Sequence, residues 1–213
     1  MKVHIADPTG LCFGVKRAIT TLEDALKTID HVYSLGSPIH NPQEINRLMK
    51  LGLVVVDKPD DVPNGSVSFV RAHGVTPKAY DALRERSSLM VDGTCPFVKT
   101  AQERANTLSK EGYVVIISGD IRHPEVQAIM GYVEGDVVVL SDLDEIPKSL
   151  YGKKCGILSQ TTQKVASFVS LVSIFVSVSP EIKVYNTICK ATLARQESVC
   201  QLASEVDGMI VLG

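Results

Sequence analysis

The chain has few aromatic residues and little net charge. Tryptophan is absent, aromatic residues make up 5% of the 213 residues, and the formal net charge is -2. Lysine and arginine form no block anywhere in the sequence. Because nucleic-acid surfaces neutralise phosphates with concentrated basic patches, nucleic acid is not a predicted partner.

Long apolar runs and targeting signals are also lacking. Residues 1–10 show no basic-then-apolar leader, and the longest apolar stretch, Val165–Val178, is short for a bilayer and interrupted by serines. We therefore expect a cytoplasmic protein with no membrane partner. In the same stretch serine recurs at helical spacing, which predicts a mostly buried helix with a thin polar stripe.

Cysteine is scarce, and its five copies include no closely spaced pair of the kind that binds structural zinc. An odd number of scattered cysteines favours reduced thiols over a disulfide framework. Cys155, inside "CGILS", and Cys200, beside Val199 and Ala203, are expected to be core residues. Cys12, Cys95 and Cys189 need a separate explanation.

Short β-rich runs alternate with helical stretches along the whole chain. The predicted strands include "KVHIA", "HVYSL", "GLVVV", "VSFV", "YVVIIS", "DVVVL" and "CGILS". This alternation predicts an α/β fold with mostly parallel sheets, which place ligands beyond the carboxyl ends of their strands.

Three segments share one context, in which a strand ends, a cysteine follows and a helix begins. They are "HIADPTGLC", "LMVDGTC" before a helix over 96–110, and "VYNTIC" before a helix over 190–205. The cysteines lie 83 and 94 residues apart, a spacing that suits three similar α/β units in pseudo-threefold array. We predict units at 1–95, 96–187 and 188–213, the third one truncated because only 24 residues follow Cys189.

A thiolate at a helix start is stabilised by free N–H groups and the helix dipole, so these sulfurs suit metal binding. Packing alone also explains a single buried cysteine. Three ligands from three separate segments favour an iron–sulfur cube with three protein ligands over a structural zinc site. The closely clustered cysteines usual for iron–sulfur clusters are, however, missing. A phosphatase-type loop at Cys12 is disfavoured because only four residues separate Cys12 from Arg17.

Histidines close three further strand ends: His40 in "VYSLGSPIHN", His73 in "VSFVRAHG" and His123 in "VVIISGDIRHPE". Each could be structural, but together they offer donors to an anion such as a diphosphate. Glu125 could simply favour the first turn of a helix, or could deliver protons if an apolar pocket raises its pKa. Thr161 in "SQTTQ" could cap a helix or relay that proton.

Seven motifs in order carry a family resemblance: "GLCFGVKRAI", "IHNPQEI", "RAHGV", "DGTCPFV", "HPEV", "SQTTQ" and "NTICKATLARQE". From Lys2 to the last residue the chain resembles the 4-hydroxy-3-methylbut-2-enyl diphosphate reductases of the non-mevalonate isoprenoid pathway. The resemblance implies a [4Fe-4S] cluster held by Cys12, Cys95 and Cys189. It also implies substrate binding by His40, His73 and His123, and proton donation by Glu125 with Thr161 close by.

The implied reaction removes the allylic hydroxyl with two electrons and two protons, giving isopentenyl and dimethylallyl diphosphates. A flavodoxin or ferredoxin would supply the electrons. Gly93 and Ala128 stand where the family often has alanine and glycine, and we expect these exchanges to matter little. The short third unit predicts weak cluster binding and little turnover. Two alternatives stay open: an inactive cluster- or metal-binding fragment that needs a partner, and an α/β domain without metal.

Overall fold

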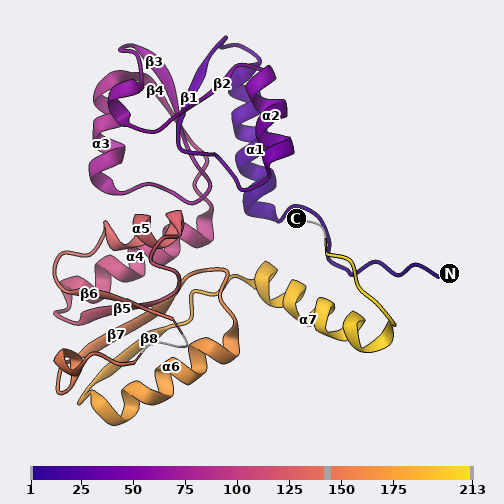
Figure 1. The fold of residues 1–213 in the computed structure, drawn as a ribbon. Coiled ribbons are helices and arrows are strands. Elements are labelled where there is room, and N and C mark those ends of the chain that lie inside the picture. The colour runs from indigo at the N-terminus through magenta and orange to yellow at the C-terminus, as the bar shows by residue number, and fades with distance from the viewer. Residues whose placement is uncertain (1, 142–144, 212–213) are drawn as a thin grey trace.

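The computed structural model describes residues 2–141 and 145–211. Two α/β units follow one another along the chain, and a single helix then extends away from them (Figure 1). The first unit contains α1 (Phe13–Leu26), β1 (Val32–Leu35), α2 (Pro42–Lys50), β2 (Leu53–Val56), β3 (Ser66–Val70), α3 (Pro77–Arg86) and β4 (Ser87–Asp92). The second contains α4 (Pro96–Lys110), β5 (Val114–Ser118), α5 (Pro124–Met130), β6 (Val137–Leu140), β7 (Cys155–Ser159), α6 (Val165–Val178) and β8 (Ile182–Tyr185), and α7 (Lys190–Glu205) follows.

The two sheets are built to the same plan. Each has four strands, and the orders β2-β1-β3-β4 and β6-β5-β7-β8 are equivalent strand by strand. All neighbouring strands run parallel, for example β1 beside β3 and β5 beside β7. The predicted α/β fold with parallel sheets is therefore confirmed. Parallel strands bring all their carboxyl ends to one edge of each sheet.

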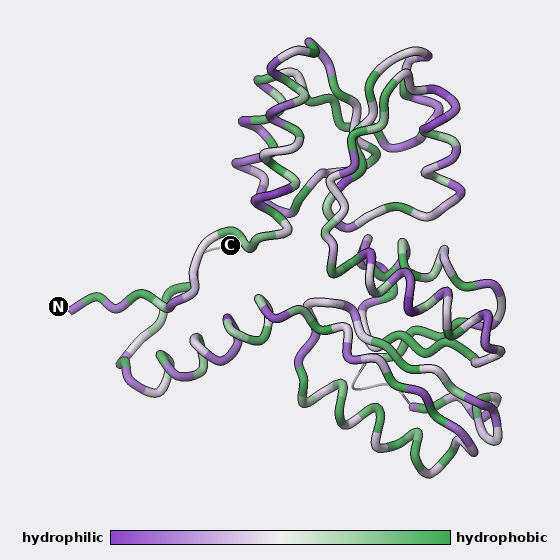
Figure 2. The backbone as a smooth tube through the Cα atoms, turned by 180° about the vertical axis from the view of Figure 1, so that it is seen from behind, coloured by the Kyte–Doolittle hydropathy of each residue, from purple (hydrophilic) through white to green (hydrophobic). Residues whose placement is uncertain are grey.

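Continuous apolar strands form the centre of each unit, as expected for sheets covered on both faces. In the first unit Val32, Phe69 and Leu22 are fully buried, and in the second Ile116, Ile117 and Ile157 are fully buried. Figure 2 shows the strands of the second unit as largely hydrophobic stretches of the tube. Packing against α1, α2, α4, α5 and α6 completes the two cores.

Both cysteine-led helices predicted after Cys95 and Cys189 begin and end where the sequence indicates, at 96–110 and 190–205. Proline at the first position helps α4 to start, because its fixed backbone angle suits the first turn and its missing N–H would have no helical partner there. The boundaries predicted for the three units stay a prediction. The first sheet ends at Asp92 and the second at Tyr185.

Two predictions about apolar segments are wrong. Residues 2–6 form no strand, because no described segment pairs with them, and Val3 and Ile5 are largely exposed. The 165–178 helix exists but is not mostly buried, since only Phe168, Leu171 and Phe175 are buried. Among the described residues, no helix is long and apolar enough to cross a bilayer.

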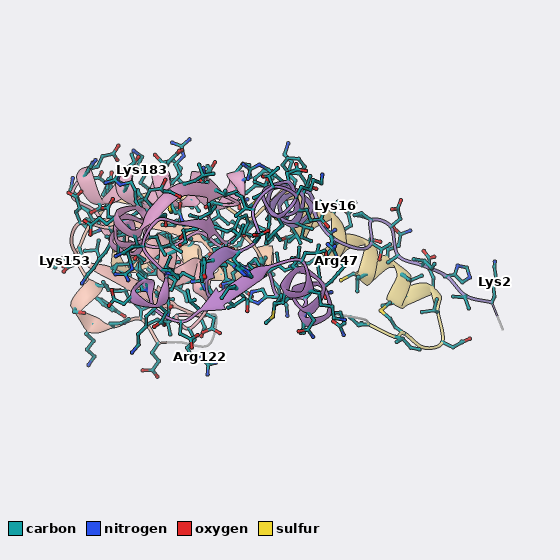
Figure 3. All side chains as sticks on the ribbon, turned by 90° about the horizontal axis from the view of Figure 1, so that it is seen from above. Lys2, Lys16, Arg47, Arg122, Lys153 and Lys183 are labelled. Carbon is teal, nitrogen blue, oxygen red and sulfur yellow. The ribbon has the colours of Figure 1, made fainter. Side chains whose placement is uncertain are left out.

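The prediction for Cys200 is also wrong, whereas Cys155 is fully buried as expected. Cys200 is exposed on α7, a helix with no buried residue, of which Leu193 is partly buried against the second core. Charged side chains are dispersed over the outside: the lysines and arginines labelled in Figure 3 are scattered around the molecule and do not gather in one place.

Candidate active site

The residues predicted to form a site follow equivalent strands of the two sheets. His40 and His123 each come five residues after their strands, β1 and β5. His73 and Thr161 follow the equivalent strands β3 and β7, while Cys95 and Cys189 follow β4 and β8. Because the two sheets have the same topology, these residues lie at the carboxyl ends of equivalent strands.

Each of the three cysteines is the N-cap of a helix, Cys12 of α1, Cys95 of α4 and Cys189 of α7. Gly14 shows how closely two of them approach. A β-carbon on Gly14 would lie 2.5 Å from Cys95 Sγ and 4.0 Å from Cys12 Sγ, so any larger residue would collide with a thiol. The Cys95 sulfur thus packs against the first turn of α1, on the side where Cys12 also lies.

The pKa of the Cys95 thiol is raised, mainly by burial. Backbone N–H groups of Phe97 and Val98 oppose this effect, while negative charge on Cys12 and Cys189 would add to it. The N–H groups at the helix start do lower this pKa, as expected, but burial outweighs them. Cys12 and Cys189 each lie within electrostatic range of Cys95.

Backbone hydrogen bonds hold the strand-end loops of the first unit together. The Ala72 N–H donates to the Pro38 carbonyl at 3.1 Å, and the Cys95 N–H donates to the Ala72 carbonyl at 3.0 Å. The turn containing His73 therefore lies between the loop leading to His40 and the start of α4. One peptide segment fixes the spacing of two histidines and a cysteine.

The three histidines form a compact cluster from both units. The ring centroid of His40 lies 4.3 Å from that of His73 and 5.2 Å from that of His123, and the His73 and His123 centroids are 5.4 Å apart. Their ring nitrogens include a set that lies within 4.8 Å of one another. The cluster joins the two units at their strand ends.

Burial keeps two of these imidazoles neutral. It lowers the pKa of His73 to about 3, with further contributions from the charges of His40, His123 and Arg71. Burial likewise lowers the pKa of His123. Nδ1 of His73 is buried and has no hydrogen-bond partner among the described residues, so one polar atom of the cluster is unsatisfied there.

Local hydrogen bonding fixes the tautomer of His123. The ring caps α5, and its Nδ1 accepts from the Glu125 N–H at 3.1 Å. In a neutral imidazole the proton must then be on Nε2, which lies 3.3 Å from Nε2 of His40. His123 therefore presents a donor to the centre of the cluster, which suits an anionic oxygen.

Glu125 is the most deeply buried acid of the site, with 2% of its surface exposed. Its Oε1 accepts from the Thr161 N–H at 2.6 Å, and its Oε2 accepts from the Thr161 hydroxyl at 2.8 Å. Burial raises the pKa of Glu125, and the two hydrogen bonds from Thr161 only partly oppose that rise. Glu125 and Thr161, predicted separately, are thus in direct contact.

Thr161 also contacts the third cysteine. Its carbonyl accepts from the Cys189 N–H at 2.9 Å and from the Thr192 hydroxyl at 3.1 Å. The Thr192 N–H in turn donates to Cys189 Sγ at 3.4 Å. The carboxyl of Glu125 and the start of α7 are therefore connected through one residue.

Two features were not foreseen from the sequence. Arg71, half-buried between the loops that carry His40 and His73, belongs to the motif "RAHGV" but was not among the predicted site residues. Its position two residues before a strand-end histidine is the signal that could have identified it. Gly93 is the other: a β-carbon there would lie 2.1 Å from Phe69 Cζ and 2.8 Å from the Val70 carbonyl, so exchange with alanine is not a minor change here.

The amino-acid sequence of this chain is similar to those of known proteins. Residues 3–213 match the family model described as LytB protein. A 4-hydroxy-3-methylbut-2-enyl diphosphate reductase of Syntrophotalea carbinolica is 41% identical over 100% of this chain and 76% of the relative. The Aquifex aeolicus protein of the same name is 43% identical over 99% of this chain and 74% of its own length.

Solved structures give the same result. The structure of a protein described as (E)-4-hydroxy-3-methyl-but-2-enyl diphosphate reductase, the terminal enzyme of the non-mevalonate pathway, has a TM-score of 0.81 and 42% identity, and the match covers 99% of this chain and 76% of that one. A Plasmodium falciparum reductase structure has a TM-score of 0.83 at 26% identity, covering 94% of this chain and 65% of that one. This chain therefore belongs to the LytB protein family, whose similar members are named as reductases of the non-mevalonate pathway.

Proposed function

We propose that the chain is an iron–sulfur oxidoreductase that converts 4-hydroxy-3-methylbut-2-enyl diphosphate to isopentenyl and dimethylallyl diphosphates. One observation carries the proposal: the buried Glu125–Thr161 pair contacts both the histidine cluster, through His123, and the third cysteine, through the Cys189 N–H. An acid, an anion-binding cluster and thiol ligands are the parts that this reaction needs. The names of the relatives support the same substrate.

The three cysteines would hold a [4Fe-4S] cluster. Each thiol begins a different helix, so the three sulfurs come from separate segments, which suits ligands of different irons in one cluster. The missing side chain of Gly14 lets the Cys95 sulfur lie close to the start of α1, next to Cys12. When bound, the cluster would supply single electrons and an iron without a protein ligand that can act as a Lewis acid.

The histidine cluster would bind the diphosphate. His123 donates from Nε2, and the unpartnered Nδ1 of His73 provides a further polar atom. Neutral imidazoles lose little on burial compared with charged ones, and they can still donate hydrogen bonds to phosphate oxygens. The cluster would therefore orient the substrate by its diphosphate and keep water away from that end.

Glu125 would donate the proton that lets the hydroxyl leave as water. Hydroxide is a poor leaving group, and burial raises the pKa of Glu125 so that its protonated form persists closer to neutral pH. The carbon–oxygen bond breaks, two electrons and two protons are consumed, and one water is released. We assign the electrons to a flavodoxin or ferredoxin type donor and the reaction to the cytoplasm.

Anaerobic reconstitution with iron and sulfide tests the proposal. The expected product is a brown protein that absorbs near about 400 nm, contains about four irons per chain and reduces the allylic diphosphate when given a reduced carrier. Zinc in place of iron, or a protein that stays colourless, would contradict it. Product analysis should detect both isomeric diphosphates.

A second candidate is a cluster-binding chain without turnover that needs another chain to complete its site. The observation favouring it is α7, which carries Cys189 at its start but buries none of its own residues. The same experiment separates the candidates. Iron binding without product formation would support the second, and activity restored by an added chain would identify its partner.

A further inference from the structure

The side chain of Arg71 bridges the two loops that carry His40 and His73. Its Nε donates to the Gly74 carbonyl at 3.2 Å, directly after His73. Its Nη1 occupies the space beside Gly36, where a β-carbon would lie only 2.5 Å away, in the loop leading to His40. Gly36 also has a φ of 69°, a conformation that glycine adopts readily. The lack of a side chain at Gly36 thus allows this guanidinium to lie beside the histidine cluster.

The charge of Arg71 has no acidic partner. No carboxylate among the described residues lies within ion-pair distance of it, and the only cause that moves its pKa is burial, which lowers it. An unpaired, half-buried cation is costly unless something else neutralises it.

Two cations near the strand ends have acidic partners, since Lys99 pairs with Asp92 and Arg122 pairs with Asp120. Arg17, like Arg71, donates to backbone carbonyls, those of Thr94 and Asp92. Arg71 differs from these residues in its position between the two histidine loops. Its charge also helps to keep the pKa of both His73 and His123 low, after burial and the neighbouring imidazoles.

Two kinds of ligand could occupy the histidine cluster, a metal cation or an anion. Ring nitrogens within 4.8 Å would suit a cation, but the neighbouring positive charge of Arg71 opposes one. The bond from the Glu125 N–H to His123 Nδ1 also leaves the proton on Nε2, which removes the lone pair that a metal would need there. Both observations favour an anion.

We infer that Arg71 is the positioning and charge-determining residue of the diphosphate subsite: it braces the His40 and His73 loops and supplies the fixed positive charge that neutral imidazoles lack. The inference rests on the proposed function and deepens it. A guanidinium suits this role because it stays charged when half-buried and is planar enough to fit between two loops. Its charge acts on a diphosphate across the loops and requires no direct contact.

Binding of inorganic pyrophosphate to the full chain tests the inference without any turnover. We expect Arg71→Met to weaken pyrophosphate binding at least about tenfold, and Arg71→Lys to weaken it less because the charge is kept. The dependence of the dissociation constant on salt should become shallower in Arg71→Met. In the reconstituted enzyme the same variant should raise KM with little change in kcat.

Arg86→Met is the matched control. Arg86 is also partly buried and also donates to a backbone carbonyl, that of Val62, but it lies beyond the other end of the first sheet. Its pyrophosphate affinity should stay within about twofold of the unsubstituted chain. If Arg71→Met cannot fold, Arg71→Lys and the salt dependence of the unsubstituted chain carry the test.

The outcomes are separable. Pyrophosphate binding that is unchanged in Arg71→Met and Arg71→Lys would overturn the role of Arg71 and leave the proposed function intact. No pyrophosphate binding by the unsubstituted chain would overturn both. Tight Zn²⁺ binding that competes with pyrophosphate and is unaffected by Arg71→Met would identify the cluster as a cation site and overturn the inference.

Discussion

The two α/β units share one strand order but supply different chemistry at equivalent positions. After β1 and β5 both units place a histidine, His40 and His123. After β3 the first unit has His73, whereas after β7 the second has Thr161, which binds the carboxyl of Glu125. The first unit therefore contributes two of the three imidazoles and the Arg71 charge, and the second contributes the third imidazole and the buried acid. Under the proposed function both units would bind the anion, and only the second would deliver the proton.

The acids that follow the two equivalent histidines show this division most clearly. Glu125 comes two residues after His123 and is buried, whereas Glu44 comes four residues after His40, at the surface, where it pairs with Arg47. Arg47 lowers the pKa of Glu44 through a hydrogen bond, while burial raises the pKa of Glu125. The environment, and not the residue type, separates a surface ion pair from a buried acid that we propose as the proton donor.

The largest expected effect comes from the equivalent cysteines. Cys95→Ala and Cys189→Ala should each reduce iron content after reconstitution to near background. A [4Fe-4S] cluster with only three protein ligands is not retained when one of them is removed. Cys200→Ala, on the exposed side of α7, is the matched control and should keep full iron content. Equal iron in all three variants would remove the cysteines from the site.

A smaller loss is expected when the acid is neutralised. Glu125→Gln should lower kcat by about 10² to 10⁴ while iron content and colour are retained, because only proton transfer is removed. Glu44→Gln tests the comparison directly and should leave kcat unchanged. If both variants lose turnover equally, or if Glu125→Gln keeps it, the assignment of the acid to the second unit is wrong.

Gly93 gives a stability effect confined to the first unit. We expect Gly93→Ala to lower the free energy of unfolding by about 1–3 kcal/mol, because the added methyl group collides with the fully buried Phe69 ring and the Val70 carbonyl. Gly208→Ala, where nothing lies within 4 Å, should change it by less than about 0.5 kcal/mol. Denaturant titration of both variants provides the measurement, and equal midpoints would refute the steric argument.

The smallest effect concerns acid stability at His73. Its folded pKa of about 3 lies below the ordinary value of 6.5, so the unfolded chain takes up this proton first as the pH falls. Stability should be unaffected above pH about 6.5 and decrease by up to about 1.4 kcal/mol per pH unit below it. His73→Gln should flatten that part of the stability–pH curve, whereas an unchanged slope would mean that His73 titrates normally.

Much of the fold could be predicted because strand ends and helix starts are encoded locally. Apolar runs that end in a turn, followed by cysteine or histidine, mark β1, β4, β5 and β8 together with α4 and α7. The parallel sheets follow from the alternation of these elements. The neighbourhood of His40, His73 and His123 could also be expected, since parallel strands end at one edge.

The misses concern residues whose state depends on packing partners elsewhere in the chain. Residues 2–6 read as a strand but have no described neighbour, and the outer face of α6 is apolar yet uncovered. The pKa of Cys95 depends on burial that no local pattern reveals, and the tight fit at Gly93 depends on Phe69. Arg71 was missed because its isolation from carboxylates is visible only in three dimensions.

Thr161 makes the position of the acid inseparable from that of a thiol. Its amide and hydroxyl hold the two oxygens of Glu125, and its carbonyl holds the amide of Cys189. The N–H and the carbonyl of Thr161 belong to two consecutive peptide units, so a movement at the start of α7 has a path of only one residue to the carboxyl of Glu125. Under the proposed function, cluster binding at Cys189 and the position of the proposed proton donor would therefore be coupled through Thr161.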